Sequence, residues 1–490
     1  MINILFILSA ILTGISHQPW GLGFLAWFSL IPTIYFFNNQ ISVKKVIGYA
    51  FLWGFIYHIS FLYWLSGNIG IESITLKYFT MLLVSCFLSL NFILIFILYF
   101  IFKKFFNKNY TIYILPIIVV SIEFLRSFGL YGFTWNSLSY TQTDYLMISQ
   151  NIEYTGIYGL SFWIVLINVM IYDLLQKFSK KKLYIFIFSF LFPWITGSII
   201  QNLYVNPKEY INTKIIQPNI SLSEKRTNLN QSLLTLISLS TISNNDSVDL
   251  IVWPESSISS HFLINDNYND KVSSEMNNFL KNQKINLVAG LESNYTNKRF
   301  NSSVLFTGDS ISNIYHKQRL VPNVEHTPSF FDKIGYNMGQ SNFNIGKELS
   351  IFNANNIPFG SMICIESIFP NPTRLFVNNG AEFIVYIVND GWYTKAPEPQ
   401  QHAKRCVYRA IENRRSVVRC ANTGISMIVD PYGNITHQLE LNKNGVINAN
   451  ITISDRKTFY TKYGNLFSIL NLFSLILMGL FIIFKKRIKS

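Results

Sequence analysis

Long apolar runs, separated by short polar segments, dominate the first 200 residues of the chain. About 20 apolar residues are needed for a helix to cross the hydrocarbon core of a bilayer. Eight runs approach or reach that length, and we predict spans at 2–16, 21–38, 46–65, 78–102, 110–126, 156–176, 183–200 and 464–484. The first run lacks a basic start and a small-residue cleavage site, so we interpret it as a retained span and not as a signal peptide.

The pattern changes between the seventh and eighth runs. Residues 205–460 contain short and alternating apolar runs, Asn-rich turns and no run of spanning length. Stretches such as "VDLIVWPES" and "AEFIVYIVNDGW" predict buried strands, and 398–415 has helical composition, which together indicate an α/β or α+β fold. The sequence therefore predicts a membrane domain at 1–204, a soluble domain at 205–460, and a last transmembrane helix with a basic tail at 461–490.

The positive charge of the chain follows the ends of the predicted spans. Half of the residues are hydrophobic and the formal net charge is +14. Lys and Arg cluster in the loops after spans two, four and six and in the tail after span eight, so the charge indicates topology and no nucleic-acid partner is expected. Because positive loops stay in the cytoplasm, both termini are predicted to be cytoplasmic and the 205–460 domain to lie on the outer face.

The predicted outer loop at 126–155 is long and aromatic. Its aromatic side chains fit two interpretations that stay open, namely anchors at the membrane interface or a lipid-accessible entrance. Glu123 and Arg126 stand at the end of the fifth span, where ionisable groups pair or reach the interface, and they are assigned no catalytic role. The spans contain few paired charges, which argues against a transporter.

The chain has four cysteines, at Cys86, Cys364, Cys406 and Cys420. They form no CxxC pair and no Cys/His ligand spacing, so we expect neither a metal site nor a cofactor. A disulfide bridge between Cys406 and Cys420 stays open. Cys364 ends an apolar strand in "GSMICIESIFP", a position that suits either a core thiol or a nucleophile.

Two further polar residues make the nucleophile interpretation chemically complete. Glu255 ends the strand "VDLIVWPES", and Lys317 sits in "IYHKQRLVPNVEHTP". A thiol needs a base or a positive field to attack an acyl carbon; a carboxylate takes its proton, and an ammonium stabilises the thiolate and the oxyanion. A Cys–His pair competes with this arrangement. His316 and Lys317 are adjacent in a strand and point to opposite faces, and no spacing connects His402 with Cys364.

The order of these motifs resembles a known family. "VWPES", "HKQRLVPNVEHTP" and "CIESIFP" resemble the carbon–nitrogen hydrolase (nitrilase) superfamily, whose Glu–Lys–Cys triad lies in an α-β-β-α sandwich. Seven spans before that domain and one after it, with "EFLRSFGLYGFTWNSLSY" and "NDGWY…QHAKRCVYRAIENRR", resemble the apolipoprotein N-acyltransferase family over essentially the whole chain. The resemblance implies a polytopic α-helical membrane domain of eight spans with an extracytoplasmic nitrilase-like α-β-β-α sandwich domain.

The resemblance also implies roles for single residues. Cys364 is expected to be the nucleophile, Glu255 the general base and Lys317 the oxyanion stabiliser. Glu325 matches the glutamate that supports the lysine. Glu366 matches the acidic residue after the nucleophile, and Trp392 matches the tryptophan of a lid. Taken alone, each residue also fits a structural role. Glu255 fits a surface carboxylate at a strand end, Lys317 a solvated charge, and Glu325 the partner of an ion pair. Trp392 fits an anchor at the membrane interface.

The implied function is the last step of lipoprotein maturation in the bacterial inner membrane. A monomer would transfer an acyl chain from a glycerophospholipid, through a thioester on the enzyme, to the α-amine of an S-diacylglyceryl-cysteine apolipoprotein. Two alternatives stay open: a membrane-anchored amidase that releases a free acid, and a non-catalytic lipid-binding protein. The chain departs from the family pattern at Ile365, at Asn323-Val324 and at Thr134, positions that affect pocket lining and loop shape and not the proton-transfer groups.

Overall fold

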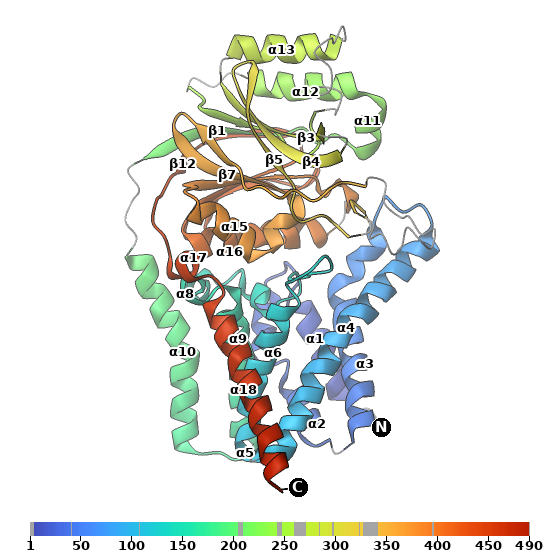
Figure 1. Cartoon of the computed structure of the whole chain (residues 1–490), viewed down its shortest axis with the longest axis vertical. Helices are drawn as coiled ribbons and strands as arrows, with labels where there is room; N and C mark the ends of the chain where they lie inside the picture. Colours follow the sequence, from blue (N-terminus) through green and yellow to red (C-terminus); the bar gives the residue numbers. More distant parts are fainter. Residues whose placement is uncertain are drawn as a thin grey trace. The chain divides into compact units, whose positions relative to one another are not determined.

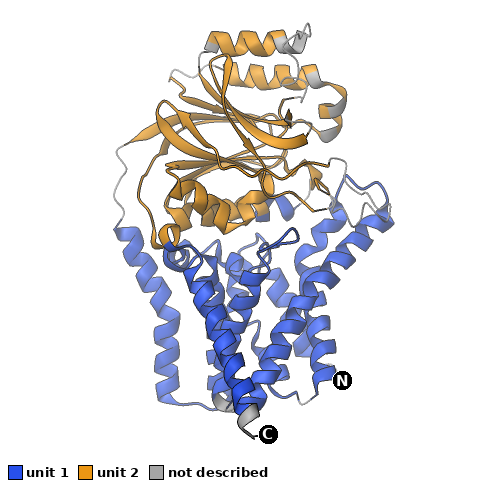
Figure 2. Ribbon diagram, in the orientation of Figure 1, with its two compact units in different colours: residues 1–204, 395–401, 463–490 blue, residues 205–394, 402–462 orange. Residues whose placement is uncertain are grey.

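The chain folds into two compact units, coloured separately in Figure 2. The computed structural model describes residues 4–40, 42–106, 108–203, 209–242, 247–258, 271–283, 285–295, 298–322, 324–326, 342–393 and 396–489. Unit 1 comprises Met1–Tyr204, Lys395–Gln401 and Tyr463–Ser490, and unit 2 comprises Val205–Thr394 and His402–Lys462. The sequence pattern places 395–401 in the soluble domain, whereas its contacts assign this segment to unit 1.

Unit 1 is built from apolar helices (Figure 1). Its longer helices are α1 (Ile4–Ile15), α2 (Ile31–Asn38), α3 (Val43–Leu62), α4 (Ile74–Phe105), α6 (Leu115–Leu125), α9 (Ile157–Gln176), α10 (Lys180–Asn202) and α18 (Leu466–Lys489). Short helical turns connect them: η1 (Leu22–Trp27), η2 (Tyr63–Gly67), α5 (Lys108–Thr111), η3 (Ile112–Ile114), η4 (Leu138–Gln142), α7 (Leu146–Ser149) and α8 (Ile152–Thr155). Helix α3 packs against α4, and α6 packs against both α9 and α18.

Each of the eight apolar segments predicted to span a membrane contains an apolar helix. Among the residues that the structure describes, five helices are long and apolar enough to cross a bilayer: Val43–Gly67, Ile74–Phe105, Ile157–Gln176, Lys180–Asn202 and Leu466–Lys485. The first, second and fifth predicted spans coincide with the shorter apolar helices Ile4–Ile15, Leu22–Asn38 and Ile112–Leu125. The apolar helical domain is therefore confirmed, while the number of eight spans stays a prediction.

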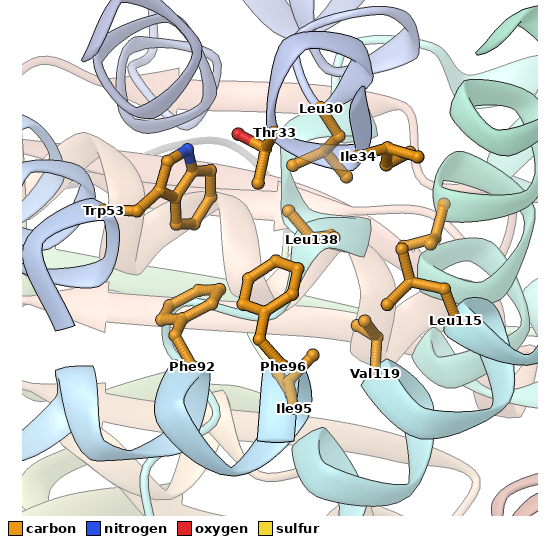
Figure 3. Close-up of a pocket in the computed structure, with 11 residues that line it drawn as sticks. Leu30, Thr33, Ile34, Trp53, Phe92, Ile95, Phe96, Leu115, Val119 and Leu138 are labelled. Atoms are coloured by element: carbon orange, nitrogen blue, oxygen red, sulfur yellow. The ribbon is translucent and has the colours of Figure 1, made fainter. Parts of the chain in front are cut away.

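The helices of unit 1 differ in how far they are covered by protein. In the apolar window of α9, 67% of the residues are buried, against 11% in that of α10. Helix α9 is thus a central helix, while α10 presents its apolar side chains outward, as a helix in contact with lipid does. Inside the unit, apolar side chains from α2, α3, α4 and α6 surround a small cavity, with Trp53, Phe92 and Phe96 on one side and Val119 and Leu115 on the other (Figure 3).

Unit 2 contains two six-stranded mixed sheets. The first has the order β12-β1-β2-β3-β4-β5, and the second has the order β11-β10-β9-β8-β7-β6. The strands of the first sheet are β1 (Tyr210–Gln217), β2 (Leu250–Val252), β3 (Asn286–Tyr295), β4 (Lys298–Thr307), β5 (Ser310–His316) and β12 (Gly445–Thr452). Those of the second are β6 (Ile351–Ala354), β7 (Ile357–Ile363), β8 (Phe383–Val388), β9 (Ser416–Ala421), β10 (Ser426–Val429) and β11 (Ile435–Leu439).

The two sheets face each other, and helices cover their outer faces (Figure 1). Helices α11 (Leu222–Thr227), α12 (Leu229–Thr241) and α13 (Lys271–Gln283) lie on the side of the first sheet, and α15 (Pro370–Asn378) and α16 (Glu398–Asn413) on the side of the second. The short helix α17 (Phe459–Tyr463) follows the last strand. Between the sheets, the hydroxyls of Ser303 and Ser361 lie 2.7 Å apart. The predicted α-β-β-α sandwich is therefore confirmed for unit 2.

The parallel strands at the centre of each sheet determine where a site can form. Strands β1, β2 and β3 run parallel, as do β7, β8 and β9. All residues of β2, β8 and β9 are buried, which explains their continuous apolar sequences. Because the carboxyl ends of parallel strands meet at one edge of a sheet, the polar residues that follow β7 and β8 lie at one edge of the second sheet, and those that follow β2 lie at the corresponding strand end of the first.

Candidate active site

Cys364 directly follows strand β7 and is the first residue of the helical turn η6 (Cys364–Ile368). Its φ angle is +50°, a left-handed backbone conformation that costs a non-glycine residue on the order of 1 kcal/mol. The side chain is partly buried. The sharp turn from strand to helix therefore presents the thiol at the carboxyl edge of the second sheet.

The carboxylate of Glu366 holds this turn from within. Its Oε2 accepts a hydrogen bond of 2.8 Å from the backbone N–H of Ile363. Its Oε1 accepts hydrogen bonds from the hydroxyl of Tyr315 at 2.7 Å and from the backbone N–H groups of Gln318 and Arg319 at 2.8 and 3.1 Å. Burial raises the pKa of Glu366, although these donors oppose the shift. With four donors bound, the carboxylate connects the Cys364 turn to the loop after β5 and is not placed to act as a base.

Lys317 follows β5 and forms a buried ion-pair cluster with two glutamates. Its side chain is 1% exposed, and Nζ lies 3.1 Å from Glu255 Oε1 and 2.8 Å from Glu325 Oε1. The amide of Asn301, in β4, donates to the same two oxygens at 2.8 and 2.9 Å. Burial by itself lowers the pKa of Lys317, but the two carboxylates outweigh it and raise that pKa well above its usual range. The lysine therefore carries its positive charge throughout the physiological pH range.

Glu255 lies three residues beyond the end of β2, in a closely packed turn. Ser256 has a φ angle of +53°. The neighbouring strand β3 has a glycine, Gly290, where a Cβ atom would lie 2.6 Å from the Cα of Glu255. The backbone N–H of Gly290 donates to the carbonyl of Pro254 at 3.2 Å. Only glycine lets β3 approach this closely, and this approach fixes the Glu255 backbone opposite Lys317.

The thiol of Cys364 is in the protonated form at rest. Burial raises its pKa well above that of an ordinary thiol; the charge of Glu255 adds to this shift, and the charge of Lys317 opposes it. A thiol in this state attacks an acyl group only when a base takes its proton during the reaction. The side chains of Glu255 and Lys317 both act on the thiol electrostatically, and they are paired with each other at 3.1 Å.

The remaining predicted residues lie around this cluster. Trp392 is half-buried in the turn η7 (Asp390–Trp392), which follows β8 at the same sheet edge. The side chain of Glu325 is bound to the preceding turn, since its Oε2 accepts a hydrogen bond of 2.8 Å from the backbone N–H of Val321. Ile365 is half-buried beside the thiol, and Asn323 lies outside the described residues. Cys406 and Cys420 are both free and buried, so the structure contains no disulfide bridge between them.

Sequence reasoning missed Asn301, which donates to both glutamates of the cluster. Its strand, β4, carries no motif, but Asn is depleted in strands, and a buried Asn within one is a signal of a polar partner. It also found no connection for His402, whose Nε2 lies 3.2 Å from the carbonyl oxygen of Cys364. That contact arises from the packing of α16 against the turn, which no spacing in the sequence shows.

Comparisons with known proteins agree with the two-part organisation. The family model described as the apolipoprotein N-acyltransferase N-terminal domain matches residues 9–170, and the carbon-nitrogen hydrolase model matches residues 214–460. A protein of Thermotoga maritima is 30% identical, over 94% of this chain and 90% of that protein. Proteins of Geobacter metallireducens (26% identical, 94% and 91%) and Rickettsia prowazekii (29%, 97% and 97%) are also similar. All three are named apolipoprotein N-acyltransferase, and this chain belongs to the apolipoprotein N-acyltransferase family.

Proposed function

We propose that the protein transfers a fatty acyl chain from a glycerophospholipid to the free α-amine of an S-diacylglyceryl-cysteine at the amino terminus of an apolipoprotein. The transfer passes through a thioester on Cys364. The observation that carries the proposal is the convergence of Glu255 and Lys317 on the surroundings of a strained, protonated Cys364 thiol. Family membership supports the choice of acyl transfer as the reaction.

The first half-reaction acylates the enzyme. Glu255 accepts the thiol proton as Sγ of Cys364 attacks the carbonyl carbon of a phospholipid ester, and the ammonium of Lys317 stabilises the oxyanion that forms. The tetrahedral intermediate collapses, the C–O bond breaks, and Glu255 returns the proton to the departing lysophospholipid oxygen. A thioester between Cys364 and the acyl chain remains.

The second half-reaction moves the acyl chain to nitrogen. The α-amine of the diacylglyceryl-cysteine attacks the thioester carbon, Lys317 again stabilises the oxyanion, and Glu255 accepts a proton from the amine. The C–S bond then breaks, and the proton on Glu255 returns to the thiolate of Cys364. The products are an amide-linked acyl chain and the free enzyme, so atoms and charges balance without a cofactor.

Two carboxylates beside one lysine serve this scheme differently. Glu255 exchanges protons, so it needs to change its charge during each half-reaction. Glu325 lies 2.8 Å from Lys317 and is tied to the backbone at Val321, which suits a residue that holds the lysine in place. Trp392, half-buried at the same edge, is proposed as part of a lid near the lipid.

The membrane domain fits a reaction between two anchored substrates. Both the phospholipid and the diacylglyceryl apolipoprotein are confined to the membrane, and confinement removes much of the entropy cost of bringing two reactants together. We propose that the protein is a monomer of the bacterial inner membrane, with the catalytic domain on the outer face and both termini in the cytoplasm, as the positive loops indicate.

The test is a labelling experiment on the full chain in detergent or liposomes. Phospholipid labelled in its acyl chains is incubated with the wild type and with Cys364→Ser, and the proteins are separated without reducing agent. The proposal predicts a label on the wild type that hydroxylamine removes and that Cys364→Ser lacks. Addition of a diacylglyceryl-cysteine peptide should then move the label to the peptide. A label that persists on Cys364→Ser contradicts the nucleophile, and release of free fatty acid in place of transfer favours an amidase.

A further inference from the structure

A second cluster of buried polar side chains contacts the turn at Cys364. It consists of Asp390 in η7, His402 in α16 and Arg419 in β9, none of which has a step in the scheme above. Asp390 Oδ1 lies 2.8 Å from Nδ1 of His402. Asp390 Oδ2 accepts a hydrogen bond of 2.8 Å from Arg419 Nη2. One carboxylate therefore orients both the imidazole ring and the guanidinium group.

The ionisation of Asp390 determines which atom holds the shared proton. Burial raises the pKa of Asp390, but Arg419 and His402 outweigh it and lower that pKa to about 2. An ionised carboxylate only accepts hydrogen bonds, so the proton between Asp390 and His402 belongs to Nδ1. With its ring fixed in this way, His402 directs Nε2 toward the η6 turn.

Two oxygen atoms of that turn face Nε2 of His402. The hydroxyl of Ser367 lies at 3.0 Å and the carbonyl oxygen of Cys364 at 3.2 Å. The hydroxyl of Ser367 is also 3.0 Å from the same carbonyl oxygen. A carbonyl oxygen only accepts, and a hydroxyl has one proton to give. If Nε2 carries a proton, the carbonyl receives hydrogen bonds from both side chains; if Nε2 is bare, the proton of Ser367 can serve only one of two acceptors.

We propose that His402 carries a proton on each ring nitrogen, Nδ1–H toward Asp390 and Nε2–H toward the η6 turn, and that it is a positioning residue. It donates its Nε2–H to the carbonyl oxygen of Cys364 and so holds the nucleophile in its left-handed backbone conformation. Asp390 and Arg419 act through His402 by keeping its ring oriented. A hydrogen bond to the carbonyl oxygen of Cys364 constrains the backbone of this residue directly. The direction of the carbonyl depends on the strained backbone conformation of Cys364, whose φ is +50°. The inference rests on the proposed function, in which Cys364 is the nucleophile.

Two substitutions separate a hydrogen-bond donor from a space filler. In His402→Gln the side-chain amide nitrogen takes the place of Nε2, whereas in His402→Asn the amide reaches only as far as Nδ1. An exposed histidine in β11 supplies a matched control, His437→Asn. We expect His402→Asn to lower the maximal rate of acyl-enzyme formation about tenfold or more, with an unchanged KM for phospholipid, because the loss of a buried hydrogen bond falls on the geometry of the reacting group. His402→Gln should recover most of the rate, and His437→Asn should equal the wild type.

A second measurement needs no acyl transfer. The rate at which iodoacetamide alkylates Cys364 reports the presentation of the thiol directly, and it should change in His402→Asn and return toward the wild type in His402→Gln. Equal rates for the two variants, in acylation or in alkylation, overturn the inference, as does a wild-type rate in His402→Asn. If the wild type forms no Cys364-dependent acyl-enzyme, the proposed function fails, and the alkylation rates still decide the role of His402.

Discussion

At the scale of single residues, the surroundings of Cys364 destabilise its thiolate form. Burial first, and then the charge of Glu255, raise the pKa of the thiol, while Lys317 only partly offsets them. The carboxylate of Glu255, which adds to the effect of burial, is the same group that we propose removes the thiol proton. In the proposed scheme Glu255 therefore has two measurable and opposite effects: it raises the pKa of the resting thiol, and it accepts the thiol proton in the reaction.

Substitution of Glu255 by glutamine should change two rates in opposite directions. Removal of the negative charge lowers the pKa of Cys364, so iodoacetamide alkylation at pH 7 becomes faster. Acyl-enzyme formation from phospholipid should fall by roughly 10² to 10⁴, because general-base catalysis is lost. In the wild type, alkylation should keep rising with pH beyond the usual range of a thiol. Burial raises the pKa of Cys406 to about 11, so its contribution to the signal stays low. Parallel changes in the two rates would contradict the base.

The role of Glu366 can be tested by an almost isosteric change. Four donors converge on its two oxygens, and Glu366→Gln replaces an acceptor by an N–H₂ group that faces donors. We expect a loss of roughly 2 to 3 kcal/mol in the free energy of unfolding, since a buried donor is left unsatisfied. Thermal unfolding in detergent measures the change, with the exposed Glu440→Gln as the control. An unfolding midpoint equal to that of the control would show that Glu366 does not hold the turn.

At the scale of elements, three parallel-strand ends and one glycine assemble the site. Strands β2, β7 and β8 end at the turns that carry Glu255, Cys364 and Asp390. The sequence marks all three, because a continuous apolar run that stops at a polar residue is visible without a structure. Strand β3 contributes through Gly290, whose importance comes only from its distance to the Glu255 backbone. Positions of that kind depend on the register between strands and carry no signal in a single sequence.

Gly290→Ala should separate the position of Glu255 from the fold. The added Cβ would lie 2.6 Å from the Cα of Glu255 and 2.7 Å from the backbone nitrogen of Ser256, and neither backbone atom can turn away. We expect the Glu255 turn to move off Lys317 and the rate of acyl-enzyme formation to fall at least tenfold, since a misplacement of about 1 Å can reduce a rate about a hundredfold. Gly308→Ala is the control: nothing lies within 4 Å of its Cβ, although its φ is +61°. It should lower stability slightly and leave the acylation rate unchanged; equal rates in the two variants would contradict the prediction.

The strands that the sequence predicts are more buried than the strands that it does not predict. The strands now labelled β1, β2, β3, β4, β7, β8, β9 and β10 are visible as apolar runs. The pattern did not mark β5, β6, β11 and β12, whose residues are exposed or only partly buried at many positions. In the described part of the membrane domain, composition located the apolar helices, but three of them, Ile4–Ile15, Leu22–Asn38 and Ile112–Leu125, are shorter than the others. Burial and composition are therefore predictable from one sequence, whereas contacts between distant segments, such as Asn301 with Glu255, are not.

At the scale of the whole molecule, the two units differ in the polarity of the surface that they expose. Unit 1 exposes many large apolar side chains, above all on α4, α10 and α18, which water would not tolerate but lipid does. Unit 2 buries its apolar strands between two sheets and carries the polar cluster at one edge. One chain thus combines a lipid-solvated part and a water-solvated part, so the side of the membrane on which the second part lies decides which substrates reach it.

The orientation can be measured with single cysteines in a Cys364→Ser background. Glu72→Cys places a thiol in the exposed loop before α4, which contains no Lys or Arg, and Phe178→Cys places one in the lysine-rich loop between α9 and α10. Because positive loops are retained in the cytoplasm, a membrane-impermeant maleimide should label Glu72→Cys in intact spheroplasts and Phe178→Cys only after permeabilisation. The background protein without an added cysteine measures labelling of the native thiols. The reverse pattern would place the Glu255–Lys317–Cys364 cluster in the cytoplasm, away from the outer leaflet, and would contradict the proposed acceptor, whereas equal labelling in intact cells would contradict the predicted number of spans.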